Sequence, residues 1–289
     1  MAELLIDNLT VGFDTPTGPV DVVQGLSLQM GAERVGIVGE SGSGKSMTAR
    51  AIMGLIRKPG TVSADRMAFD GIDLLAQNAA SWRNIRGSRI AMILQDPKFS
   101  LNPVLRVGRQ IAEAGLLHGA FGKQQARARV LEMLTTVGVD APERVFDAYP
   151  HQLSGGIGQR VMIAAMMIAS PSLLIADEPT SALDVMVRAQ VLGIMDQEIR
   201  KRGMGLLMIS HDLNMVASFC DRVIVMFRGR VVDACAAKDL FLSRHPYTQG
   251  LLDCLPTGEQ RGQPLRTIDR QHIDAMAQTH GHQGRSDGA

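Results

Sequence analysis

Residues 39–46 read Gly-Glu-Ser-Gly-Ser-Gly-Lys-Ser, a complete match to the pattern G-x-x-x-x-G-K-[ST]. The apolar run at residues 34–38 predicts a buried strand before this octapeptide, and residues 48–53 predict a helix after it. A loop between a strand and a helix N-terminus directs unpaired backbone N–H groups and the positive end of the helix dipole at an anion. The sequence therefore predicts a loop that binds the phosphates of a nucleotide.

Each residue type in this phosphate loop has a physical role. Glycines let the backbone curl around phosphates with no Cβ in the way. Lys45 can reach the β- and γ-phosphates, and the Ser46 hydroxyl can ligate Mg²⁺. We therefore expect the nucleotide to be bound by Gly39, Glu40, Ser41, Gly42, Ser43, Gly44, Lys45 and Ser46.

Composition and charge narrow the class of protein. The 289 residues are 45% hydrophobic and 20% charged, with a formal net charge of +1, which is typical of a globular protein and predicts no nucleic-acid partner. The wide spacing of Cys220, Cys235 and Cys254 argues against a disulfide framework or a zinc site and fits a reducing compartment. The start of the chain shows no secretory signal pattern. The longest apolar run, residues 161–169, is much shorter than the roughly 20 residues of a membrane-spanning helix, so we expect no membrane crossing by this chain itself.

Short apolar runs alternate with helical patterns along the chain. Residues 3–30 predict an antiparallel strand–turn–strand, and residues 104–137 have helical periodicity. The later alternation predicts a parallel α/β sheet covered on both faces. Further strands are expected at 67–74, 90–94, 173–176, 205–209 and 222–232, and helices at 187–201 and shortly after 245. We interpret the 17 methionines as core residues and the polar tail, 279–289, as disordered.

The strand expected at residues 173–176 ends in two carboxylates. Asp177 can hold Mg²⁺ through water, and Glu178 can orient and deprotonate an attacking water molecule. An Asp-Glu pair after a strand is weak evidence by itself. On the same sheet as a phosphate loop, it becomes the expected metal ligand and catalytic base.

Two more polar residues follow expected strands, Gln95 and His211. The carboxyl ends of strands in an open α/β sheet converge on the ligand crevice. We therefore expect Gln95 to bind Mg²⁺ or the attacking water and His211 to touch the γ-phosphate. For either residue alone, the alternative is an ordinary polar residue on the surface.

The segment Leu153-Ser154-Gly155-Gly156-Ile157-Gly158-Gln159-Arg160 predicts a second anion site. Ser154 is a good N-cap for the helix expected at 161–169, and the Gly-Gly backbone leaves amides accessible. A chain that binds one nucleotide hardly needs two phosphate cradles. The economical explanation is a head-to-tail pair, in which this segment closes on the nucleotide of a partner chain.

The phosphate loop, Gln95, residues 153–160, Asp177-Glu178, residues 181–184 and His211 together resemble the ATP-binding-cassette ATPases, over roughly residues 3–245. The resemblance implies a P-loop NTPase core, an N-terminal antiparallel β subdomain, a helical subdomain inserted at roughly 99–170, and a C-terminal extension over 246–289.

The same resemblance implies roles for individual residues. Ser154, Gly155 and Gly156 would contact the ATP of the partner, and Asp184 would signal across the dimer. An aromatic residue near the N-terminus would stack on adenine, and Phe13 is the matching position. For Phe13 a core residue of a strand is the alternative.

Three narrower stretches, residues 95–103, 149–152 and 245–248, look like the ATPase subunits of dipeptide, oligopeptide and nickel importers. This implies ATP and Mg²⁺ as cofactors, ATP hydrolysis coupled to transport, and a place at the cytoplasmic face of a bacterial inner membrane. The implied partners are a second and different ATPase chain, two membrane-spanning permease subunits and an extracytoplasmic substrate-binding protein. The alternatives are a cassette acting on DNA or ribosomes, and an accessory cassette of a non-transport complex such as phosphonate breakdown.

The sequence departs from the family pattern in two places. Position 158 is glycine where a long polar residue is common, and we expect it to be a tolerated gap. The alternative is that a partner packs against the bare backbone and requires it. No cysteine follows Cys254, so we predict no iron–sulfur cluster. We interpret His272, His280 and His282 as solvated residues rather than metal ligands.

Overall fold

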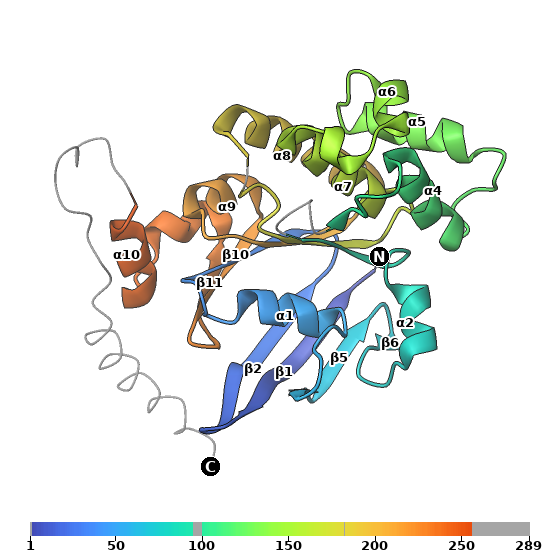
Figure 1. Ribbon diagram of the computed structural model, residues 1–289. Coiled ribbons are helices and arrows are strands. Elements are labelled where there is room, and N and C mark those ends of the chain that lie inside the picture. The colour runs from blue at the N-terminus through green and yellow to red at the C-terminus, as the bar shows by residue number, and fades with distance from the viewer. Residues whose placement is uncertain (1, 95–99, 182, 256–289) are drawn as a thin grey trace, which may run out of the picture.

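The computed structural model describes residues 2–94, 100–181 and 183–255, in which two β-sheets combine with a group of helices (Figure 1). The central sheet has the strand order β11-β10-β3-β9-β8-β7, and every neighbouring pair from β10 to β7 is parallel. β11 is antiparallel to β10 and closes one edge. These strands are β3 (Arg34–Val38), β7 (Ile90–Ile93), β8 (Leu173–Asp177), β9 (Gly205–Ile209), β10 (Arg222–Phe227) and β11 (Arg230–Ala236). The predicted parallel sheet is confirmed.

The second sheet is antiparallel and comes from the N-terminal part of the chain. β1 and β2 form a long hairpin whose register runs from the pair Leu4 and Met30 to the pair Thr15 and Gly18 at the turn. This confirms the strand–turn–strand expected at residues 3–30. The strands are β1 (Leu4–Thr15), β2 (Gly18–Met30), β4 (Gly60–Ser63), β5 (Arg66–Phe69) and β6 (Ile72–Asp73).

Helices cover the sheets and also form a separate group. Figure 1 shows α4 to α7 gathered on the side of the central sheet away from the antiparallel sheet. The α-helices are α1 (Lys45–Ile52), α2 (Ala79–Ile85), α4 (Val107–Leu117), α5 (Ala126–Thr136), α6 (Pro142–Asp147), α7 (Gly155–Met167), α8 (Val185–Arg202), α9 (Leu213–Phe219) and α10 (Pro246–Asp253). Two 3₁₀ helices, η1 (Pro150–Gln152) and η2 (Ala237–Leu242), complete the described elements.

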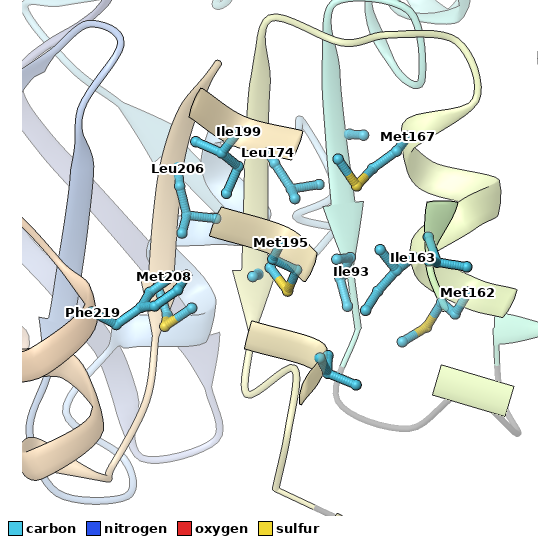
Figure 2. Close-up of a cluster of buried hydrophobic side chains, with 14 of the residues drawn as sticks. Ile93, Met162, Ile163, Met167, Leu174, Met195, Ile199, Leu206, Met208 and Phe219 are labelled. Carbon is cyan, nitrogen blue, oxygen red and sulfur yellow. The ribbon is translucent and has the colours of Figure 1, made fainter. Parts of the chain in front are cut away.

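Two hydrophobic cores lie on opposite faces of the central sheet, because successive side chains of a strand point to opposite sides. In β9, Leu207 and Ile209 pack with the antiparallel sheet and α1. Leu206 and Met208 face the other way, toward α7, α8 and α9, as Figure 2 shows. The methionines in this second core include Met162, Met167, Met195, Met204, Met208 and Met215. Their burial supports the interpretation of the methionines as core residues.

Helix starts differ from the sequence expectation. α1 begins at Lys45 rather than at residue 48, and α7 begins at Gly155 rather than at 161. The first turn of α7 is rich in glycines, which lower helix propensity and contribute no apolar periodicity, so the pattern hides it. In α7 the N-cap Ser154 offsets that weakness by accepting a hydrogen bond from the Ile157 backbone N–H.

Candidate nucleotide-binding and hydrolysis site

The phosphate loop connects β3 to α1, as predicted. Gly39, Gly42 and Gly44 adopt positive φ angles of 147°, 83° and 102°. A Cβ on Gly39 would come within 2.1 Å of the Met226 carbonyl oxygen, and one on Gly44 within 2.5 Å of the Val22 carbonyl oxygen. The loop is therefore wrapped tightly between β2 and β10, and glycine is required at both positions.

Lys45, the first residue of α1, is buried inside its own loop. Its Nζ donates hydrogen bonds to the carbonyl oxygens of Gly39, at 2.9 Å, and Glu40, at 2.8 Å. Burial lowers the pKa of the Lys45 ammonium, and the negative charges of nearby carboxylates, Glu178 first among them, oppose that shift. The loop thus holds a cation at the helix N-terminus, the arrangement that an anionic phosphate needs.

Ser46 lies against the end of β8. Its hydroxyl donates a hydrogen bond to Asp177 Oδ1 at 3.0 Å. Burial raises the pKa of the Asp177 carboxyl, and the hydrogen bond from Ser46 opposes the shift. A hydroxyl and a carboxylate held this close offer the hard oxygen donors that Mg²⁺ prefers, so these two residues fit the metal role expected for them.

Glu178 and His211 come together although they lie 33 positions apart in the sequence. His211 Nδ1 is 2.8 Å from Glu178 Oε1. The His211 side chain is 67% exposed and that of Glu178 only 17%, so the carboxylate is sheltered under an accessible imidazole. Glu178 has a positive φ of 51°, and its backbone N–H donates to the Ile209 carbonyl oxygen, which fixes it at the carboxyl edge of the sheet. The predicted base and the predicted γ-phosphate contact therefore share one site with Asp177 and Lys45.

The segment 153–160 forms a separate and more open site. Ser154 caps α7, and the exposed Asp184 caps α8 by accepting a hydrogen bond from the Val187 N–H at 2.9 Å. Ser154 and Gly155 are exposed, and a Cβ on Gly155 would meet nothing within 4 Å. The segment borders a cavity of about 1180 Å³ whose lining includes Ser154, Gly156 and Val187 but no residue of the phosphate loop.

Two contacts near the site, one buried and one half-buried, were not expected from the sequence. Gln159 donates from Nε2 to the Pro179 carbonyl oxygen, one residue beyond Glu178. Arg188 on α8 forms an ion pair with Asp212, at 2.7 Å, next to His211. The first contact ties α7 to the residue after Glu178, and the second ties α8 to the residue after His211. Gln159 stands inside a recognised motif, but nothing local in the sequence marks Arg188 and Asp212 as partners.

The expectations for Gln95, Phe13 and Gly158 stay untested by the structure. Gln95 lies outside the described residues. Phe13 is half-buried on β1, where its ring lies beside Gly60, and its stacking on adenine stays a prediction. Gly158 is buried in α7, and the tolerated gap expected there stays a prediction.

A glycine-rich loop around a buried lysine, with an Asp-Glu pair at the end of a parallel strand of the same sheet, defines a P-loop nucleoside triphosphatase. Comparison with known proteins narrows the class further. The model of the family described as "ABC transporter" matches residues 23–181, and the chain belongs to this family. As a member, it is an ATP-binding ATPase.

Individual relatives agree with this assignment. The chain is 48% identical over 273 residues to the "Dipeptide transport ATP-binding protein DppD" of Haemophilus influenzae, covering 93% of this chain and 83% of the relative. It is 43% identical over 263 residues to the "Oligopeptide transport ATP-binding protein OppD" of Bacillus subtilis, covering 90% and 74%.

A solved structure described as "Dimeric Structure of MJ0796, a Bacterial ABC Transporter Cassette" has the same fold. It superposes with a TM-score of 0.71 at 27% identity, covering 82% of this chain and 99% of the solved one. The same cassette has also been solved in a post-hydrolysis state "bound to ADP and Pi". In the described part of the present chain, no helix is long and apolar enough to cross a membrane.

Proposed function

We propose that this chain binds and hydrolyses ATP to power an importer of dipeptides or oligopeptides. The observation that carries the chemistry is the assembly of Lys45, Ser46, Asp177, Glu178 and His211 at one edge of the sheet. The names of the relatives, which are peptide-transport ATP-binding proteins matched over about nine-tenths of this chain, support the substrate class. None of the relatives reported above is named for nickel or for a non-transport complex.

Each residue of the site has a defined task in hydrolysis. Lys45 and the amides of residues 39–46 bind the phosphates. Ser46 and Asp177 would hold Mg²⁺, with Gln95 as a further proposed ligand, and the metal when bound neutralises phosphate charge. Glu178 Oε1 accepts the proton of the attacking water. His211, now paired with Glu178, holds that carboxylate in place and, from its exposed position, reaches the γ-phosphate.

The exposed segment 153–160 would complete the nucleotide site of a partner cassette. Ser154, Gly155 and Gly156 would contact the ATP held by that partner, and Asp184 would sense it across the interface. The dimer described for the MJ0796 cassette supports such pairing. Closure on ATP and reopening after hydrolysis would then be the step that drives transport. Phe13 would stack on adenine in each half.

The remaining partners and the location follow from the importer assignment. We propose that the chain pairs with a second, different ATPase chain, beneath two membrane-spanning permease subunits and with an extracytoplasmic binding protein. Its place would be the cytoplasmic face of the membrane. We propose residues 1–245 as the ATPase domain, with α4 to α7 inside the helical insert at 99–170, and residues 246–289 as a C-terminal extension.

Co-purification tests this proposal directly. The tagged full chain should be recovered from membranes with two integral membrane proteins, and the ATPase rate of that complex should rise when a peptide-loaded binding protein is added. Glu178→Gln serves as the matched control, because it should preserve recovery and abolish the stimulated rate. Recovery with soluble enzymes instead, and no membrane pair, would contradict the transport assignment.

A further inference from the structure

The first peptide unit of the phosphate loop, between Gly39 and Glu40, is held at both ends. Its carbonyl oxygen accepts a hydrogen bond from Lys45 Nζ at 2.9 Å. Its N–H, on Glu40, donates to the hydroxyl oxygen of Tyr247 at 3.1 Å. A peptide unit is planar, so fixing the N–H also fixes the direction of the carbonyl oxygen. Tyr247 and Lys45 therefore act on the same rigid group.

Tyr247 itself is firmly placed. Its side chain is 0% exposed, and its ring packs on Phe227 of β10 with centroids 4.4 Å apart. The next residue, Thr248, donates from its hydroxyl to Asp233 Oδ2 on β11 at 2.7 Å. α10 is thus anchored to the β10–β11 hairpin on two sides. The tyrosine hydroxyl reaches the loop from a support that does not depend on the nucleotide.

The β10–β11 hairpin forms the wall on which the loop rests. The Gly229 N–H, at the turn of this hairpin, donates to the Ser43 carbonyl oxygen at 3.0 Å. Met226 closes the space beside Gly39. These contacts hold the loop backbone in position, and Tyr247 adds a side-chain acceptor at the peptide unit on which the lysine rests.

We propose that Tyr247 is a positioning residue of the nucleotide site, whose hydroxyl orients the Gly39–Glu40 peptide unit and thereby places the Lys45 ammonium for the phosphates. Tyr247 lies beyond residues 23–181, the part that the family model matches. The C-terminal helix α10 is therefore a working part of the ATP site in this chain. The inference concerns ATP binding and is independent of which solute the importer moves.

Tyr247→Phe is the direct test, because it removes only the hydroxyl and keeps the ring on Phe227. The half-buried Glu40 N–H then loses this acceptor, and the peptide unit is freer to rotate. Titration calorimetry of the full chain with ATP should show a Kd about three- to tenfold higher. In the assembled complex, KM for ATP should rise while kcat stays within about twofold.

Thr248→Val is the matched control on the same helix. It removes the hydrogen bond to Asp233 without touching the loop, so it should lower the melting temperature and leave the ATP Kd unchanged. An unchanged Kd in Tyr247→Phe would overturn the proposal. Equal shifts of Kd in both variants would also overturn it, because they would show that α10 acts only through general stability.

A double-mutant cycle with Lys45→Ala asks whether Tyr247 acts through the lysine. The probe is a fluorescent ATP analogue, titrated to concentrations high enough to saturate the weakened site. Tyr247→Phe should change its Kd severalfold in the wild-type background and less than twofold when Lys45 is already alanine. Equal changes in both backgrounds would refute positioning through Lys45. The binding measurements use the isolated chain, so a failed transport assignment would leave their outcome unchanged.

Discussion

The phosphate loop and the segment 153–160 are both glycine-rich helix starts, but one is enclosed and the other is exposed. Both place glycines at the start of a helix, α1 in one case and α7 in the other. The phosphate loop is enclosed by β2, β10 and α10, and it contains a buried cation. The segment 153–160 presents Ser154 and Gly155 to solvent. One anion site is therefore complete within the chain, and the other is half of a site.

The phosphate loop and the segment 153–160 also differ in the charge that they offer to a phosphate. In the segment 153–160, Arg160 is turned inward, where its guanidinium donates to the carbonyl oxygens of Val137 and Gly138 and to Gln190. The segment 153–160 is left with backbone amides and the Ser154 hydroxyl as its donors. Helix-terminus contributions without a full charge amount to about 1 kcal/mol or less. Such a site should engage ATP only after the phosphate loop of a partner has bound it.

The largest effect is expected from replacing Glu178, the proposed catalytic base beside the phosphate loop. Glu178→Gln should slow ATP hydrolysis by about 10²- to 10⁴-fold, because the water loses its proton acceptor. ATP binding should persist, and the closed pair should accumulate. Phosphate release by the assembled complex and sedimentation of the ATP-loaded pair measure the two effects. Hydrolysis at the wild-type rate would remove Glu178 from its assigned role.

The next effect concerns affinity of the complete site. Lys45→Ala should weaken ATP binding by about ten- to a hundredfold, as expected for the loss of a hydrogen bond to a charged group. Calorimetry on the full chain is the measurement. Ser41→Ala is the control in the same loop, since Ser41 is exposed and keeps its backbone amide. If both variants bind ATP like the wild type, the contrast drawn between the two sites fails.

Changes in the segment 153–160 should affect ATP hydrolysis only when two cassettes are paired. Ser154→Ala should leave the ATP Kd of the isolated chain unchanged but lower ATP-dependent pairing and hydrolysis by about tenfold. The loss of the N-cap itself should cost about 1 kcal/mol of stability. Ser154→Asp separates these effects, because aspartate caps helices well but repels phosphate. Normal pairing by Ser154→Asp would show that residue 154 serves the helix alone.

The smallest effect is expected from a substitution at Gly158. Its burial predicts that Gly158→Arg destabilises the chain by about 1–3 kcal/mol, as overpacking does, instead of stabilising the helix by about 1 kcal/mol through propensity. The melting temperature of the isolated chain and the ATPase rate of the complex distinguish these outcomes. A higher melting temperature with full ATPase activity would restore the tolerated gap. A higher melting temperature without assembly would instead point to a partner that needs the bare backbone.

Local patterns were sufficient for much of the fold and of the site. The phosphate loop, the buried strands and the Asp177-Glu178 pair each occupy a few consecutive residues, and backbone geometry relates those residues directly to structure. The start of α7 is marked by its cap, Ser154, and not by apolar periodicity, because Gly155, Gly156 and Gly158 conceal the helical period. Gln95 was identified from its place after a strand, and its role stays a prediction.

By itself, then, the sequence determined which nucleotide chemistry this chain performs, because motifs of that kind are contiguous and their physics is local. Only the tertiary structure decided which distant groups meet. Tyr247 reaches Glu40 across 207 positions, and His211 reaches Glu178 across 33. The strand order β10-β3-β9-β8-β7 makes such meetings possible, because it brings the ends of strands far apart in the chain to one edge. Contacts of this kind depend on how whole elements pack, and no short run of residues encodes them.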